Sequence, residues 1–118
     1  MELANVSLAD SWVRSVETDP SSVCFVLDAV LEADHERFYW PPKPGEVSAY
    51  ARVRWRLTGE VWWDEGPNLE MSAKDASGEL DYGHIDVWLR EGDVERLEGD
   101  WGSVCVRKAQ QDVEYLDG

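Results

Sequence analysis

The residues best suited to acid–base chemistry lie in one short segment around His84. An extended strand places the side chains of Tyr82, His84, Asp86 and Trp88 on one face, because alternate residues point the same way. The imidazole and the carboxylate could then act as a general base or supply metal ligands. A metal site needs three or four donors from different elements, and the only other histidine is His35. We therefore expect no metal and no cofactor, and keep an enzyme that uses His84 and Asp86 as an alternative.

The main concentration of positive charge is the alternating row Arg52, Arg54 and Arg56. In an extended strand these side chains leave one face with about 7 Å between neighbours. They could bind an anion, beside Trp62. On an acidic protein such a row more often pairs with carboxylates of the neighbouring strands, and we favour that interpretation. The partners considered are Glu95, Glu98 and Asp28.

Seven tryptophans are several times the usual share for a chain of this length. They could line a pocket for a sugar or an aromatic ligand, anchor a protein interface, or fill a small core. The alternation of apolar residues predicts that Trp55 and Trp63 are core residues, whereas Trp62 and Trp88 fall on the polar side of their strands and stay open. The candidate residues for binding a ligand or partner are Arg52, Arg54, Arg56, Trp62, His84, Asp86 and Trp88. No catalytic residue is predicted, because the sequence has no GxSxG, P-loop, HExxH or CxxC motif.

The elements that position these residues are mostly short runs rich in Val and Trp, bounded by Gly, Asp and Pro, which is typical of strands. Residues 84–90, with Ile85, Val87 and Leu89 inward, form a predicted hairpin with residues 94–98. A proline-rich loop is expected at residues 35–46. The other expected strands are residues 11–17, 23–31, 50–63 with a bend at Gly59, 103–108 and 112–116. About seven strands predict an all-β, mainly antiparallel fold, either a small β-sandwich or a strongly curled sheet, in one domain over residues 1–118.

The formal net charge is -14, from 25 acidic and 11 basic residues. Such a field repels nucleic acids and anionic membranes and attracts basic proteins, so we expect neither a nucleic-acid partner nor a membrane partner. The opening residues resemble no secretory signal, and no run approaches the ~18 apolar residues of a membrane span, which predicts a soluble, cytoplasmic protein. Cys24 and Cys105 lie in apolar runs and are predicted to be reduced core residues.

Three segments together resemble a group of small, uncharacterised bacterial proteins: HERFYWPPKPGEVSAY, DASGELDYGHID and LEGDWGSVCV, which begin at His35, Asp75 and Leu97. These proteins share a proline-rich loop, a D-Y-G-x-I-D segment and a G-D-W-G turn, and the resemblance implies no particular activity or cofactor. The segment SWVRSVETDPSSVCFVLDAVL, from Ser11 to Leu31, is similar to the opening of some immunity proteins of bacterial toxin systems. That second resemblance implies an inhibitor that binds a toxin.

These observations favour a non-enzymatic protein-binding domain, in its specific form an immunity-type inhibitor whose acidic surface docks onto a basic toxin. The first alternative is a small-ligand binder with a tryptophan-lined cavity, in which the arginine row fixes an anionic or polar group. The second alternative is the enzyme that uses His84 and Asp86.

Overall fold

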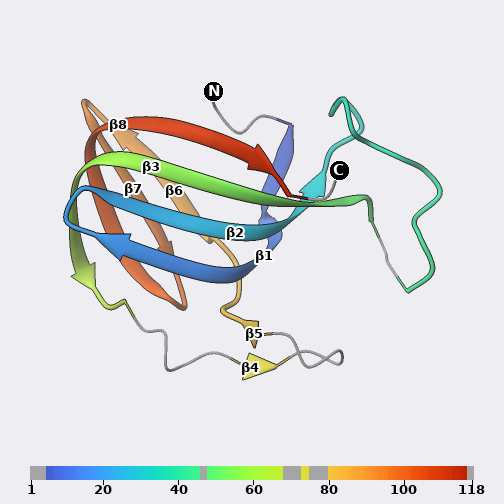
Figure 1. Cartoon of the computed structure of the whole chain (residues 1–118), viewed down its shortest axis with the longest axis horizontal. Helices are drawn as coiled ribbons and strands as arrows, with labels where there is room; N and C mark the ends of the chain where they lie inside the picture. Colours follow the sequence, from blue (N-terminus) through green and yellow to red (C-terminus); the bar gives the residue numbers. More distant parts are fainter. Residues whose placement is uncertain (1–4, 46–47, 68–72, 75–79, 117–118) are drawn as a thin grey trace.

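A single antiparallel sheet forms most of the molecule. The structure is a computed structural model that describes residues 5–45, 48–67, 73–74 and 80–116. Six strands lie in the order β1-β2-β3-β8-β7-β6, and the two shortest pair separately (Figure 1). The strands are β1 (Val6–Asp19), β2 (Ser22–Leu31), β3 (Tyr50–Glu65), β4 (Ala73–Lys74), β5 (Leu80–Asp81), β6 (Val87–Glu91), β7 (Val94–Gly99) and β8 (Gly102–Tyr115). The predicted all-β antiparallel fold is confirmed, as one curled sheet.

The sheet curls so strongly that one part of its inner face packs against another part. Figure 1 shows β6 and β7 behind the long strands β3 and β8. Trp55 of β3 and Trp88 of β6 meet across this space, with ring centroids 5.1 Å apart in a T-shaped arrangement. The inner side chains of β2 and β3 alternate regularly, so the predicted core position of Trp55 is confirmed; Trp63 is partly buried against the same core. The largest fully buried side chains are Trp55, Trp101, Phe25, Leu27, Leu57 and Leu97.

Two neighbouring strands bend at the same level of the sheet. The register of β3 against β8 shifts between Thr58 and Glu60, on either side of Gly59. A Cβ atom on Gly59 would lie 2.4 Å from the carbonyl oxygen of Arg107, so only glycine fits the bend. On β8 the matching irregularity is Lys108, whose φ of 53° is in the left-handed region. The bend predicted at Gly59 is therefore present, whereas the strands predicted at 103–108 and 112–116 are one bent strand.

Residues 82–86, which we call the bridging segment, link the outermost strand β1 to the opposite end of the sheet. The amide of Tyr82 donates to the carbonyl of Val13 at 3.0 Å, and the amide of Val13 donates to the carbonyl of Gly83 at 2.8 Å. At its other end the amide of Asp86 donates to the carbonyl of Glu98 in β7 at 2.8 Å. The bridging segment therefore covers part of the edge of β1, which a strand edge otherwise leaves open for pairing.

The bridging segment also overturns the predicted orientation of the following strand. Strand β6 begins at Val87 instead of His84, and Trp88 faces Leu97 on the inner face. Leu89, predicted to point inward, is 48% exposed, while Ile85 is buried as expected. The prediction assumed that alternate residues from His84 onward point to the same face. Gly83, at φ 85°, and its neighbours follow an irregular path instead, so this alternation does not hold across residues 84–90.

Both cysteines are free thiols and are buried, in agreement with their predicted role as core residues. Burial raises the pKa of the Cys24 thiol, and also that of Cys105. The part of the chain that the structure describes holds no helix long and apolar enough to cross a membrane.

We expect Gly99→Ala to lose about 3 kcal/mol of unfolding free energy, the upper part of the range for overpacked sites. A Cβ atom at Gly99 would lie 2.3 Å from the His84 carbonyl oxygen and 2.4 Å from Trp101 Nε1, where the bridging segment meets the sheet. The control is Gly92→Ala, which meets no atom within 4 Å and bears only the strain of its φ of 63°, about 1 kcal/mol. Urea denaturation measures both, and equal losses would contradict the tight packing at Gly99.

Candidate functional site

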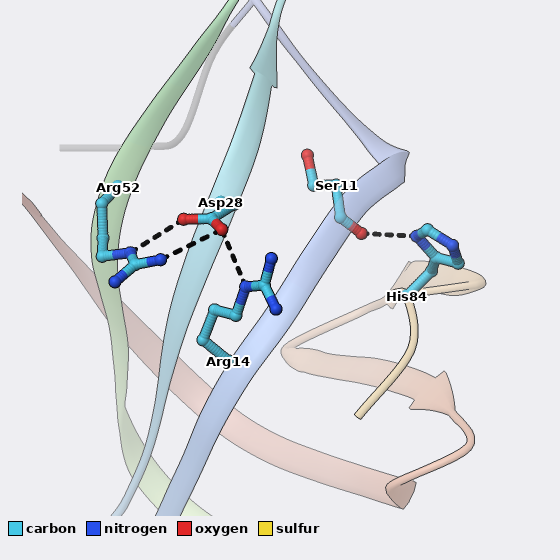
Figure 2. Close-up of polar contacts among 5 residues, drawn as sticks. All are labelled: Ser11, Arg14, Asp28, Arg52 and His84. Carbon is cyan, nitrogen blue, oxygen red and sulfur yellow. Dashed lines mark hydrogen bonds and ion pairs between the residues drawn. The ribbon is translucent and has the colours of Figure 1, made fainter. Parts of the chain in front are cut away.

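The arginine row lies on the outer face of β3, and its first member belongs to an ion-pair triad with Asp28. Asp28, on the central strand β2, accepts from Arg52 Nε at 2.8 Å and Nη2 at 3.1 Å on one side. On the other side it accepts from Arg14 Nε of β1 at 2.7 Å (Figure 2). Its side chain is only 19% exposed. The triad ties the three strands β1, β2 and β3 together through their side chains.

The other two arginines of the row also face carboxylates. Arg54 Nη1 lies 3.2 Å from Glu114 Oε2, and both side chains are exposed. Arg56 stands opposite Asp112 in the register between β3 and β8. The hollow that these four residues line has a volume of about 80 Å³, which is small compared with ligand sites. The row is therefore arranged as cross-strand pairs.

The partners of the row differ in part from those considered for it. Asp28 is one of them, whereas Glu95 binds Arg90 and Glu98 accepts from the Ser103 hydroxyl. Trp62 stands opposite Cys105 and lies under the guanidinium of Arg107, 5.3 Å from its Cζ. Along β3 it is six residues beyond Arg56, about 20 Å in an extended strand, so the geometry does not support an anion site beside Trp62.

Asp28 has a lowered pKa. Burial raises it, but the hydrogen bonds and charges of Arg52 and Arg14 outweigh that effect, so the carboxyl titrates below its usual range. An acid with a lowered folded-state pKa stabilises the fold above its unfolded pKa and loses that contribution as the pH falls.

His84 is held by a backbone carbonyl and by a ring contact. Its Nδ1 donates to the Ser11 carbonyl at 2.6 Å (Figure 2). Its ring lies 4.2 Å from that of Trp12. Asp86 is exposed, and Trp88 points into the core. The predicted grouping of His84, Asp86 and Trp88 is therefore dispersed, because residues 82–86 do not form a regular strand. Within the described ranges, no group of three or more His, Cys, Asp or Glu side chains could hold a metal.

A polar cleft that we did not predict opens where the β6–β7 hairpin leaves β8. Its volume is about 310 Å³, and its lining residues are Arg90, Gly92, Asp93, Glu95, Lys108, Ala109 and Gln111. Glu95 is buried at its floor, and its Oε1 accepts from Trp88 Nε1 at 3.0 Å, Arg90 Nε at 3.0 Å and Gln111 Nε2 at 3.1 Å. Gln111 Oε1 in turn accepts from Trp55 Nε1 at 3.0 Å. This network connects the cleft to two core tryptophans.

One signal in the sequence could have located this network. Glu95 and Leu97 are two residues apart on one strand, so a buried Leu97 implies an inward Glu95. A buried carboxylate needs a cationic or hydrogen-bonding partner. Arg90 would have been the nearest choice across the hairpin turn.

The proline-rich loop between β2 and β3 is fastened to the end of β8. His35, which is 7% exposed, accepts the Arg37 amide on Nδ1 at 3.0 Å, and its Nε2 lies 2.5 Å from the hydroxyl of Tyr115. The guanidinium of Arg37 lies over the Tyr115 ring, 4.1 Å from its centroid. His35 therefore has a structural place in the fold.

The chain matches no protein-family model, no curated protein and no solved structure.

We expect Asp28→Asn to destabilise the protein by about 1–3 kcal/mol at pH 7, because it weakens hydrogen bonds to two charged arginines. Below about pH 4, the unfolded value of an aspartate, the difference from wild type should shrink, because the unfolded wild-type chain takes up a proton first and the folded carboxyl loses its charge only at still lower pH. Urea denaturation at both pH values tests this.

The control is Arg54→Gln in the exposed pair with Glu114, with an expected loss of only about 0.2–1 kcal/mol. If Asp28→Asn cost no more than this control at pH 7, the triad would have no special role in the sheet.

Proposed function

We propose that this chain is a non-enzymatic protein-binding domain that docks onto a basic protein, in its specific form an immunity-type inhibitor of a basic toxin. The observation that carries the proposal is how the charge is distributed. Arg14, Arg52, Arg54, Arg90, Arg96 and Arg107 all form ion pairs within the sheet. Because these arginines are paired within the sheet, the unpaired charges that give the protein its net charge of -14 are mainly carboxylates.

Many of these carboxylates are exposed on the strand edges and turns. They include Asp10, Glu17, Glu32, Asp34, Glu36, Glu65, Asp86, Glu91, Asp93 and Asp100. Such a surface accelerates the encounter with a basic protein, and this effect weakens as salt screens the charges. These charges therefore support association with a partner of opposite sign.

To test the proposal, the immobilised protein is exposed to a lysate of its source cells at low and at high salt, and retained proteins are identified by mass. A retained protein is then purified and titrated against this chain by calorimetry. We expect a basic partner whose affinity falls steeply with salt. For the immunity-type form, equimolar addition of this chain should inhibit the activity of the partner. Retention of acidic proteins alone, or binding unaffected by salt, would contradict the proposal.

A second candidate function, binding of a small polar ligand, is favoured by the cleft above Glu95. The sequence predicts a cavity lined by tryptophans for such a ligand. In the structure Trp55 and Trp88 instead lie behind Glu95 and Gln111 and contact each other. The cleft of about 310 Å³ is at the small end of ligand sites, and its lining is polar and charged. A ligand there would be a small molecule with carboxylate or amine groups.

The ligand function is tested by adding citrate, L-glutamate or L-lysine and following the indole N–H signals by NMR. Binding should move the signals of Trp55 and Trp88, whose Nε1 atoms donate to two cleft residues, and should raise the melting temperature by mass action. The control is the signal of Trp101, which donates to the His84 carbonyl instead. Unmoved signals at millimolar concentrations would rule out these ligand classes.

A further inference from the structure

Trp40 is unusually exposed for a tryptophan. Its exposed fraction is 70%, against 48% for Leu89 and 37% for Leu116, the other large apolar side chains that stand out from the described surface. An indole offers a large rigid contact area. Tryptophan is among the residue types most enriched at the interface positions that dominate binding energy. Trp40 therefore offers this surface its largest exposed apolar side chain.

The residues that precede Trp40 are fastened to the rest of the fold. The preceding Tyr39 accepts the amide of Tyr50 on its hydroxyl at 3.0 Å, and Phe38 packs against the core. Upstream, the bond between His35 and Tyr115 fastens the loop to β8. A partner that covers Trp40 would therefore restrict the loop little further, and this small loss of conformational entropy favours affinity.

Carboxylates outnumber cations among the exposed side chains of the same loop. Glu32, Asp34 and Glu36 are exposed carboxylates. The loop's two described cations lie over aromatic rings, Arg37 over Tyr115 and Lys43 over Tyr39 at 4.9 Å from its centroid. All five of these charged side chains are exposed, and the three carboxylates outnumber the two cations beside one large apolar side chain.

We propose that the loop of residues 32–45 is the docking surface of this domain and that Trp40 is its anchor. The occupant is a basic protein with an apolar pocket for the indole and with Lys or Arg side chains around that pocket. This inference rests on the proposed function and names the surface that performs it. Carboxylates guide the approach, and burial of the indole holds the complex.

The test compares wild-type protein, Trp40→Ala and the control Leu89→Ala as baits for the lysate, and then in calorimetry with the purified basic protein. Both variants should keep the wild-type melting temperature, because each removes an exposed side chain. We expect Trp40→Ala to weaken binding at least about tenfold and Leu89→Ala to leave it unchanged. Poly-L-lysine serves as a probe of charge alone, and it should bind all three proteins equally.

The outcomes separate this proposal from the one on which it rests. If the basic protein binds wild type and Trp40→Ala equally, the docking surface is elsewhere and the proposed function stands. If Trp40→Ala and Leu89→Ala weaken binding equally, Trp40 is not the anchor. If wild type retains no basic protein, both proposals are overturned.

Discussion

The constraint on which this structure depends is that one sheet must cover its own apolar face. Without helices or a second large sheet in the described part of the chain, burial comes from curling, which brings β6 across from β3. The indole of Trp101 lies where the bridging segment meets the curled sheet, a place that we call the closing point. Its ring centroid is 4.9 Å from that of Phe25, and its Nε1 donates to the His84 carbonyl at 3.0 Å. Curling on this scale requires breaks in the strands, and Gly59 and Lys108 supply them side by side. Packing, bends and the bridging segment are thus consequences of one requirement.

Curling also separates the two faces chemically. The inner face takes most of the aromatic side chains, with Trp62 under Arg107 as an exception, while the outer face of the long strands carries arginines and carboxylates, among them Asp28 between Arg14 and Arg52. A carboxylate on a central strand has neighbours on both sides, so one acid can hold two arginines. Because most positive charges are used in this way, the acidic excess of the sequence becomes the character of the surface. The same pairing that stabilises the sheet therefore shapes its external field.

The sequence predicted those parts of the fold that depend on local pattern. The apolar run of residues 23–31 placed β2 correctly, and a lone glycine in an apolar run marked the bend at Gly59. Sequence-based prediction failed where a long-range contact decides the structure. The hydrogen bonds of residues 82–86 to β1 and β7 displaced the start of β6, and with it the side on which Trp88 and Leu89 lie. The candidate site divided in the same way. Arg52 and Asp28 were foreseeable as cross-strand neighbours. The spacing of Glu95 and Leu97 could have indicated a buried carboxylate, whereas the cleft above it depends on the hairpin leaving β8 at Lys108, a long-range feature.

A surface of one sign attracts every oppositely charged protein, so charge by itself gives encounter without selectivity. Selectivity needs a contact that only one shape can satisfy, and an exposed indole on a fastened loop is such a contact, because it gains free energy only inside a matching apolar pocket. The loop around Trp40 is tied to the sheet through His35 and Tyr115, at the opposite end of β8 from the closing point at Trp101. The curl brings five aromatic side chains into ring contact, Phe25, Trp55, Trp63, Trp88 and Trp101, and leaves Trp40 outside. Trp40 is thus the most exposed large apolar side chain of the described surface, which is why we place the anchor there.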